Sequence, residues 1–169
     1  VGLKTHCKCV LVVRQEESGL RRYVHVGTGN YNSKTARTYE DIGLFTCNEK
    51  IGDDVSHLFN SLTGFDKDHD FNSLIVAPRY LRSKIVELIE NEISFGKDGH
   101  IVMKINGLAD ARMIELLYQA SEAGVRIDLI VRGICCIRPS SDHEQNIRIR
   151  SVLGRYLEHS RMYHFAHGG

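Results

Sequence analysis

The sequence has no long apolar run and almost no net charge, and these two absences exclude broad classes of protein. Its longest apolar runs, such as 9–13 and 127–131, are far shorter than the roughly 20 residues that a membrane-spanning helix needs. Its 22 basic and 21 acidic side chains leave a formal charge of +1, which gives no global attraction to nucleic acid or to membranes. Any affinity for anions must therefore come from a local group of side chains.

Cysteine spacings typical of metal sites or disulfide frameworks are also absent. In a strand, Cys7 and Cys9 would face away from His6, and the adjacent pair at 135–136 has no suitably spaced histidine, so the sequence disfavours a zinc site. No signal peptide precedes the first predicted strand, and we therefore expect a reducing, cytoplasmic location. The cysteines are odd in number and form no Cys-x-x-Cys pair: Cys7, Cys9, Cys47, Cys135 and Cys136.

The composition that is present is that of an ordinary globular protein. The 169 residues are 42% apolar and 25% charged, which suffices for one or two small domains with a real core. The chain begins without methionine almost inside its first predicted strand, and it stops on His167-Gly168-Gly169, a turn signal. We therefore expect a piece of a longer protein in which both structural units are incomplete.

The first part of the chain indicates a hairpin followed by a glycine-rich turn. Runs 9–14 and 22–26 are rich in β-branched residues and flank a polar segment, so they should pair as antiparallel strands. The next segment, Gly27-Thr28-Gly29-Asn30, is either a phosphate cradle or a simple polar turn, because its glycines allow close approach to the backbone. A strand at 42–46 and a helix over 49–62, capped by Asn48, are predicted to follow.

The rest of the chain alternates strands and helices after a polar linker at 65–72. This alternation indicates parallel strands in an α/β arrangement. We thus expect two α/β units with mixed sheets and flanking helices, one over 1–64 and one over 73–169. The predicted elements are strands at 73–77, 101–105 and 127–131, helices at 80–95 and 110–123, the latter closed by Gly124, and a polar loop at 140–145.

Two pairs of a histidine and a cation carry the candidate chemistry. In a strand, His6 and Lys8 point to one side, and so do His159 and Arg161 if their segment is also a strand. One imidazole can attack phosphorus while the other donates or accepts a proton, and the cations stabilise phosphoryl oxygens. The alternative for each pair is an exposed polar strand position. Arg132 follows a predicted parallel strand at its carboxyl end, where ligands bind in such sheets, although it can also be a solvated strand end.

The duplicated pattern resembles the phospholipase D superfamily, whose His-x-Lys motif continues with an aspartate five positions after the lysine. That position is Val13 here, so the hydrolase signature is broken. A more specific resemblance, from end to end of the chain, is to the bacterial polyphosphate kinases of the first family. It rests on five segments in the same order: Gly2-Leu3-Lys4-Thr5-His6-Cys7-Lys8, Tyr23-Val24-His25-Val26-Gly27-Thr28-Gly29-Asn30-Tyr31, Thr35-Ala36-Arg37-Thr38-Tyr39, Val131-Arg132-Gly133-Ile134-Cys135-Cys136 and Arg155-Tyr156-Leu157-Glu158-His159-Ser160-Arg161.

The resemblance implies two phospholipase D-like units and reversible transfer of the ATP γ-phosphate to inorganic polyphosphate through a phosphohistidine. It places the phosphorylated histidine at His6, the adenine-facing residue at Tyr39, and phosphate-facing residues at Arg132 and His159. From the residues alone, Tyr39 could equally be a packed aromatic. The supporting cations Lys8 and Arg161 and the turn residues Gly27, Gly29 and Asn30 complete the candidate site.

The resemblance also implies the cofactors and partners of the longer parent. These are ATP and ADP, inorganic polyphosphate, and Mg²⁺ held by residues upstream of Val1. We expect a cytoplasmic homo-oligomer with no nucleic-acid partner, for which peripheral membrane association stays open. Because part of the machinery lies outside the chain, we expect the chain alone to be inactive or nearly so.

Two other functions stay open from the residues alone. A phosphodiesterase or nuclease would use the same histidines to hydrolyse a diester without ATP, and Val13 speaks against it. A non-catalytic polyanion-binding module would need only basic contacts. Those contacts would be Lys34, Arg37, Arg132 and Arg161, while the remaining histidines, including His25, are interpreted as surface or hairpin residues.

Overall fold

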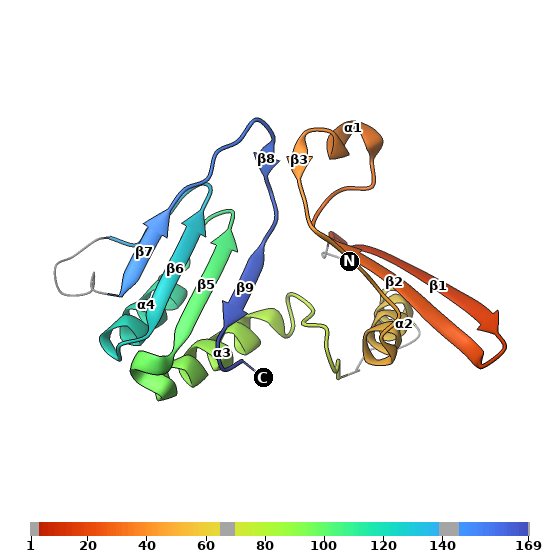
Figure 1. Cartoon of the computed structure of the whole chain (residues 1–169), viewed down its shortest axis with the longest axis horizontal. Helices are drawn as coiled ribbons and strands as arrows, with labels where there is room; N and C mark the ends of the chain where they lie inside the picture. Colours follow the sequence, from red (N-terminus) through yellow and green to blue (C-terminus); the bar gives the residue numbers. More distant parts are fainter. Residues whose placement is uncertain (1–3, 65–69, 139–145, 169) are drawn as a thin grey trace. The chain divides into compact units, whose positions relative to one another are not determined.

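The chain forms two compact units, residues 1–77 and residues 78–169, here called unit 1 and unit 2. The computed structural model describes residues 4–64, 70–138 and 146–168. Each unit combines a β-sheet with helices (Figure 1). The predicted α/β class is therefore confirmed. The predicted loop at 140–145 and positions 65–69 of the predicted linker lie outside the described residues.

Unit 1 is built on a three-stranded antiparallel sheet of order β1-β2-β4. Its strands are β1 (Lys8–Glu16), β2 (Gly19–Gly27) and β4 (Gly43–Thr46). The predicted hairpin is confirmed, and its strands run longer than the β-rich sequence because the turn takes only two residues. Gly19 makes this tight turn possible, since its φ of 116° is open to glycine and strained for other residues.

Helix α2 (Glu49–Thr63) packs against β2. The Asn48 side chain accepts a hydrogen bond from the Ile51 amide (3.2 Å), and Gly64 ends the helix with a φ of 85°, as capping rules predict. Val24 and Val55 are buried in unit 1. The short elements α1 (Ser33–Ala36) and β3 (Tyr39–Glu40) lie between β2 and β4.

The strand predicted at 73–77 is wrong, and a buried carboxylate explains why. Asp54, fully buried in α2, accepts hydrogen bonds from the amides of Asn72 (3.0 Å), Ser73 (2.6 Å) and Leu74 (2.9 Å). The Asn72 side chain donates a fourth bond to the same carboxylate (3.0 Å). Because these amides are committed to Asp54, they do not pair with a neighbouring strand.

Unit 2 contains the predicted alternation of strands and helices. Its sheet has the order β7-β6-β5-β9, in which β5, β6 and β7 are parallel and β9 runs antiparallel to β5. Apart from the strand at 73–77, the predicted elements are confirmed within one or two residues: helices at 80–95 and 110–123, and parallel strands at 101–105 and 127–131. The elements are α3 (Leu81–Phe95), a 3₁₀ turn (Gly96–Asp98), β5 (His100–Ile105), α4 (Ala111–Glu122), β6 (Arg126–Val131), β7 (Ile147–Arg150), β8 (Leu157–Glu158) and β9 (Met162–Phe165).

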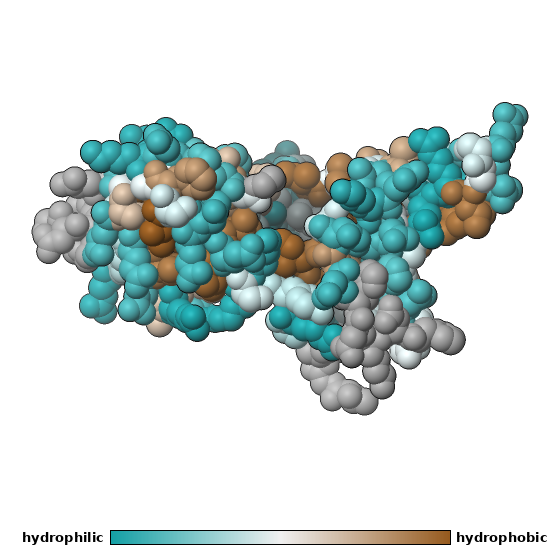
Figure 2. Space-filling view, turned by 90° about the horizontal axis from the view of Figure 1, so that it is seen from below, coloured by the Kyte–Doolittle hydropathy of each residue, from teal (hydrophilic) through white to brown (hydrophobic). Residues whose placement is uncertain are grey.

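The core of unit 2 lies between the sheet and its two long helices. Side chains of β5 and β6 alternate strictly, and every second one is buried against α3 and α4: Ile101, Met103, Ile105, Ile127, Leu129 and Val131. Polar side chains mix with exposed apolar ones at the surface (Figure 2). No helix within the described ranges is both long and apolar enough to cross a membrane.

Candidate functional site

In unit 1, His6 and Lys8 are in contact, although not for the predicted reason. Strand β1 begins at Lys8, so His6 lies before the strand and not on its face. The Lys8 ammonium lies 3.1 Å from Nε2 and 3.3 Å from Nδ1 of His6, and it donates to the His6 carbonyl (2.8 Å). An ammonium only donates, so whichever ring nitrogen accepts its hydrogen bond is the unprotonated one. A neutral imidazole beside a cation is the form that attacks phosphorus.

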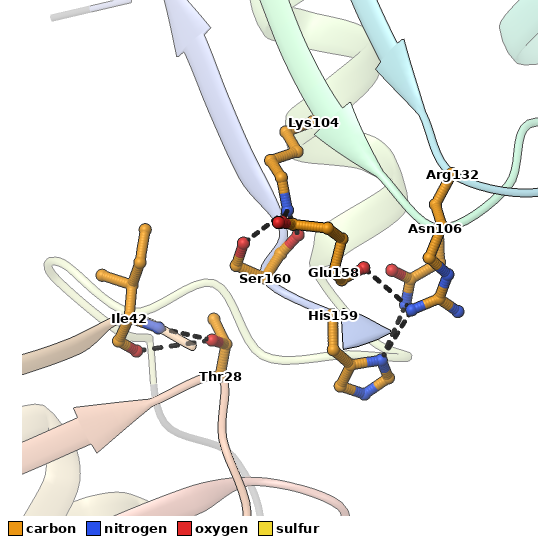
Figure 3. Close-up of polar contacts among 8 residues, drawn as sticks. All are labelled: Thr28, Ile42, Lys104, Asn106, Arg132, Glu158, His159 and Ser160. Carbon is orange, nitrogen blue, oxygen red and sulfur yellow. Dashed lines mark hydrogen bonds and ion pairs between the residues drawn. The ribbon is translucent and has the colours of Figure 1, made fainter. Parts of the chain in front are cut away.

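The glycine-rich turn lies at the same end of the hairpin as Lys8. Gly27 is the direct partner of Lys8 in the β1–β2 register. The Thr28 amide donates to the Ile42 carbonyl (2.9 Å). The Thr28 hydroxyl accepts from the Ile42 amide (3.0 Å), as Figure 3 shows. A side chain at Gly29 would collide with the Asp41 carboxylate. The Thr28 amide is thus already bonded, and binding of phosphate by Gly27, Gly29 and Asn30 stays a prediction.

His25, which was expected to be a plain surface or hairpin residue, is packed at this end of the sheet. Its Nδ1 lies 2.6 Å from the Tyr31 hydroxyl, and its ring centroid lies 4.4 Å from that of Phe45. The ring also covers Gly27 and Gly43, where a β-carbon would meet it at 3.1 Å and 2.5 Å. Both glycines therefore make room for an imidazole, a relation that sequence spacing does not reveal.

Three further candidates follow the turn. Lys34 lies in α1 and Arg37 caps its carboxyl end, while Tyr39 begins β3 and is half-buried. The Asn32 side chain caps α1 by accepting from the amides of Lys34 (3.1 Å) and Thr35 (3.2 Å). This cap fixes the backbone of the segment. Ligand binding by Lys34, Arg37 and Tyr39 stays a prediction.

In unit 2, Arg132 and His159 are brought together at the carboxyl end of β6. Arg132 directly follows the last residue of β6, and its Nη1 donates to the Glu158 carbonyl (2.9 Å) and to His159 Nδ1 (3.2 Å), as Figure 3 shows. A guanidinium has no acceptor, so Nδ1 of His159 must accept. The neutral ring then carries its proton on Nε2. His159 is therefore set up as a hydrogen-bond or proton donor through Nε2.

Lys104 holds both neighbours of His159 and was not predicted as a site residue. Its ammonium pairs with the Glu158 carboxylate (3.0 Å) and donates to the carbonyl (3.2 Å) and hydroxyl (2.6 Å) of Ser160. The lysine side chain is 13% exposed and that of Glu158 is 21% exposed. Figure 3 shows Lys104 reaching from β5 to this segment. The backbone on each side of His159 is thereby tied to the parallel sheet.

Asn106 connects the second histidine to its cation. It directly follows β5, and its Nδ2 lies 3.5 Å from His159 Nδ1. With the amide in the opposite orientation, its oxygen accepts from Arg161 at Nη2 (2.7 Å) and Nε (3.2 Å). His159 and Arg161 lie between β8 and β9, outside any strand. The Asn106 side chain thus lies beside both residues and can bond one or the other, depending on its orientation. A common strand face does not bring His159 and Arg161 together.

The described residues do not form a metal site. Among them, no group of three or more His, Cys, Asp or Glu side chains is arranged to hold an ion. Five cysteines are free thiols, and burial, followed by the nearby Cys7, raises the pKa of the Cys9 thiol. The donors of this part of the chain thus fit phosphate oxygens, through arginine, lysine and imidazole, better than they fit Mg²⁺.

Comparison with known proteins shows that almost the whole chain is similar to proteins of one kind. Residues 74–169 match the family model described as polyphosphate kinase C-terminal domain 2, and residues 1–68 match polyphosphate kinase C-terminal domain 1. The polyphosphate kinase of Synechocystis sp. is 55% identical over 173 residues, which cover 100% of this chain and 24% of that protein. The polyphosphate kinase of Mycobacterium avium is 54% identical over 169 residues, covering 98% of this chain and 23% of that protein.

A solved structure shows the same fold. The crystal structure of polyphosphate kinase from Porphyromonas gingivalis superposes with a TM-score of 0.88 at 44% identity, covering 99% of this chain and 29% of that one. The chain thus spans about a quarter of the length of the curated relatives that it matches.

Proposed function

The chain belongs to the polyphosphate kinase family, and we propose on that basis that the whole protein transfers the ATP γ-phosphate reversibly to inorganic polyphosphate. Matches to two consecutive family domains and to relatives over the full chain support this proposal. The observation that carries it is the histidine of unit 2, whose Nδ1 accepts from Arg132 at 3.2 Å. That contact leaves an Nε2–H donor next to a guanidinium, a combination that suits a phosphoryl group.

His6 is the proposed phosphoryl carrier. A ring nitrogen of His6 attacks the γ-phosphorus, an N–P bond forms, the bond to the bridging β–γ oxygen breaks, and ADP leaves with that oxygen. A terminal oxygen of polyphosphate then attacks the same phosphorus, breaks the N–P bond and restores the neutral imidazole. Lys8, which contacts the His6 ring, would offset negative charge on the phosphoryl oxygens.

The other site residues have supporting roles in this proposal. His159 would donate from Nε2 to a phosphoryl or leaving-group oxygen, while Arg132 and Arg161 bind phosphate and Tyr39 faces the adenine. Mg²⁺ would neutralise phosphate charge when bound, and the residues that hold it are proposed to lie upstream of Val1. The chain alone is proposed to be inactive or nearly so, and the cytoplasmic, homo-oligomeric state of the parent stays a prediction of the resemblance.

Incubation of the full-length parent with γ-labelled ATP tests the carrier. We expect label on the protein that is labile in acid and stable in base, as a phosphoramidate is, and its loss in His6→Ala. His57→Ala, on α2 of the same unit, is the matched control and should retain the label. Label that persists in His6→Ala would contradict the assignment, and hydrolysis of a diester without ATP would favour a phosphodiesterase instead.

A further inference from the structure

One face of the unit 2 sheet carries no helix among the described residues. Helices α3 and α4 lie on the face with the buried side chains of β5 and β6 (Figure 1). The alternate residues of the same strands point to the opposite face, here called the open face. Those of the two central strands are half-buried or exposed and mostly polar: His100, Val102, Lys104, Arg126, Asp128 and Ile130.

Strand β7 adds two arginines to the open face. In the parallel register, Arg148 lies beside Asp128 and Arg150 beside Ile130. Ile147 and Ile149 lie beside the buried Ile127 and Leu129, so they share the helix-covered face. Both arginines are exposed. Strand β7 is at the edge of the described sheet, which leaves these side chains accessible from the side as well as from above.

The two arginines differ from the other arginines of the sheet in having no hydrogen bond or ion pair within the described residues. Arg126 contacts His100 Nδ1 (2.7 Å) and Asp128 (3.8 Å), and Arg132 is bonded to Glu158 and His159. One carboxylate, Asp128, lies beside Arg148 in register, and it already pairs with His100 at 2.9 Å. The free charge of the open face is therefore concentrated on β7.

Arg148 and Arg150 lie in a row that leads toward Arg132 and His159, here called the phosphate site. Ile130, the neighbour of Arg150, precedes Arg132 by two positions, so Arg150 and Arg132 are diagonal neighbours, roughly 8 Å apart between α-carbons. Arg148 precedes Arg150 by two residues in β7, so it lies roughly 7 Å from Arg150 and farther from Arg132. The α-carbons of the three arginines thus follow one another at similar steps, from the His159 site outward along the sheet edge.

We propose that Arg148 and Arg150 bind the part of a polyphosphate chain that extends beyond the phosphate held at Arg132 and His159. This inference rests on the proposed function and adds a subsite to it. A linear polyanion with charge on every phosphate matches a row of successive arginines, because a guanidinium binds phosphate bidentately. Single-stranded nucleic acid fits less well, because Tyr163 and Phe165 share the helix-covered face in register with Met103 and Ile101, and base stacking needs aromatic platforms.

Binding of two inorganic probes to the full-length parent tests the proposal. Long-chain polyphosphate reaches from the phosphate site to β7, whereas tripolyphosphate occupies only the phosphate site. We expect Arg148→Gln and Arg150→Gln to weaken binding of the long chain by about fivefold each, the upper range for exposed ion contacts. The slope of log affinity against log salt should fall by about 0.7 for each charge removed. The dissociation constant for tripolyphosphate should not change.

Three comparisons make the result specific. Arg112→Gln removes an exposed charge from α4, on the other side of the sheet, and should leave binding of both probes unchanged. Arg148→Lys with Arg150→Lys keeps the charges and should restore most of the affinity. An unchanged Tm of the double glutamine variant shows that it folds.

The proposal is overturned if the double glutamine variant binds long-chain polyphosphate as tightly as the unaltered protein does. It is also overturned if tripolyphosphate binding weakens equally, since the arginines would then act on the phosphate site itself. Self-association of the variant with unchanged affinity would assign the arginines to protection of the sheet edge. If the unaltered protein binds neither probe, the proposed function fails, and that outcome is distinct from loss in the variants alone.

Discussion

Replacement of Lys104 by methionine asks whether His159 is positioned by the residues that flank it. Methionine fills the space of the lysine stem but removes the ammonium, with its contacts to the Glu158 carboxylate (3.0 Å) and to the Ser160 carbonyl and hydroxyl (3.2 Å and 2.6 Å). His159 itself loses no direct contact with Lys104 in this variant. A change in activity would therefore act through the position of the imidazole.

The size of the effect follows from burial. A hydrogen bond to a charged group contributes about 1.5–3 kcal/mol, and breaking a fully buried pair costs about 3–5 kcal/mol. Glu158 keeps 21% of its side-chain exposure, so water can partly solvate its carboxylate after the substitution. We expect the free energy of unfolding of unit 2 to fall by about 2 kcal/mol. A displacement of His159 by about 1 Å would lower kcat by about 100-fold.

Steady-state synthesis of polyphosphate by the full-length parent is the assay, together with thermal unfolding. We expect kcat to fall far more than KM for ATP rises, because Lys104 contacts no substrate in the proposed site. Lys97→Met, which removes an exposed lysine of unit 2, should leave both unchanged. A cycle with Glu158→Gln should give a coupling energy of about 1–2 kcal/mol. Activity of Lys104→Met within twofold of the unaltered protein would refute the positioning role.

Two buried or bonded carboxylates make the fold sensitive to acid. Burial tends to raise the pKa of Asp54, but hydrogen bonds from Asn72, Ser73 and Leu74 outweigh it and hold the pKa below its usual value. The ionised carboxylate therefore stabilises the folded state at pH values above the pKa of the unfolded chain, and this contribution is lost as pH falls. Asp54→Asn should therefore lower the free energy of unfolding at neutral pH by about 2–3 kcal/mol and flatten its acid dependence in a chemical denaturation series. Asp110 caps the start of α4, and the Arg82 guanidinium and the Met113 amide lower its pKa from 3.8 to about 2. The Tm of the unaltered protein should therefore fall as the pH drops between those two values, and Asp110→Asn should lack this fall. Identical pH profiles of Tm would contradict the stabilising role of Asp110.

Features that depend on neighbouring residues could be predicted from the sequence, whereas contacts between residues far apart in the chain could not. Helix α4 follows from periodicity over neighbouring residues, and Gly124, predicted to close it, has a positive φ of 97°. The segment at 73–77 has strand composition, but its amides are captured by Asp54, which lies about twenty residues earlier in the chain. No local pattern shows that competition between a carboxylate and a neighbouring strand.

The candidate site divides in the same way. His6 and Lys8 are two residues apart, so their contact was predictable, although the strand begins later than expected. Lys104 acts across more than fifty positions of the chain and looks like an ordinary strand lysine in the sequence. Asn106 did carry a signal, since it directly follows a parallel strand just as Arg132 does. A search of both strand ends would have found it.

The place where β1 begins has a consequence for how a phosphoryl carrier can work. The ladder between β1 and β2 starts at the pair of Lys8 and Gly27 and continues to Glu16 and Gly19. His6 precedes the first residue pair of this ladder, so its backbone can change conformation while all the hydrogen bonds between β1 and β2 stay formed. In the proposed mechanism, His6 meets ATP first and polyphosphate second, so a movement between them would change the backbone of the two residues that precede β1. The β1–β2 hairpin would then stay fixed while only the short segment that carries His6 moves.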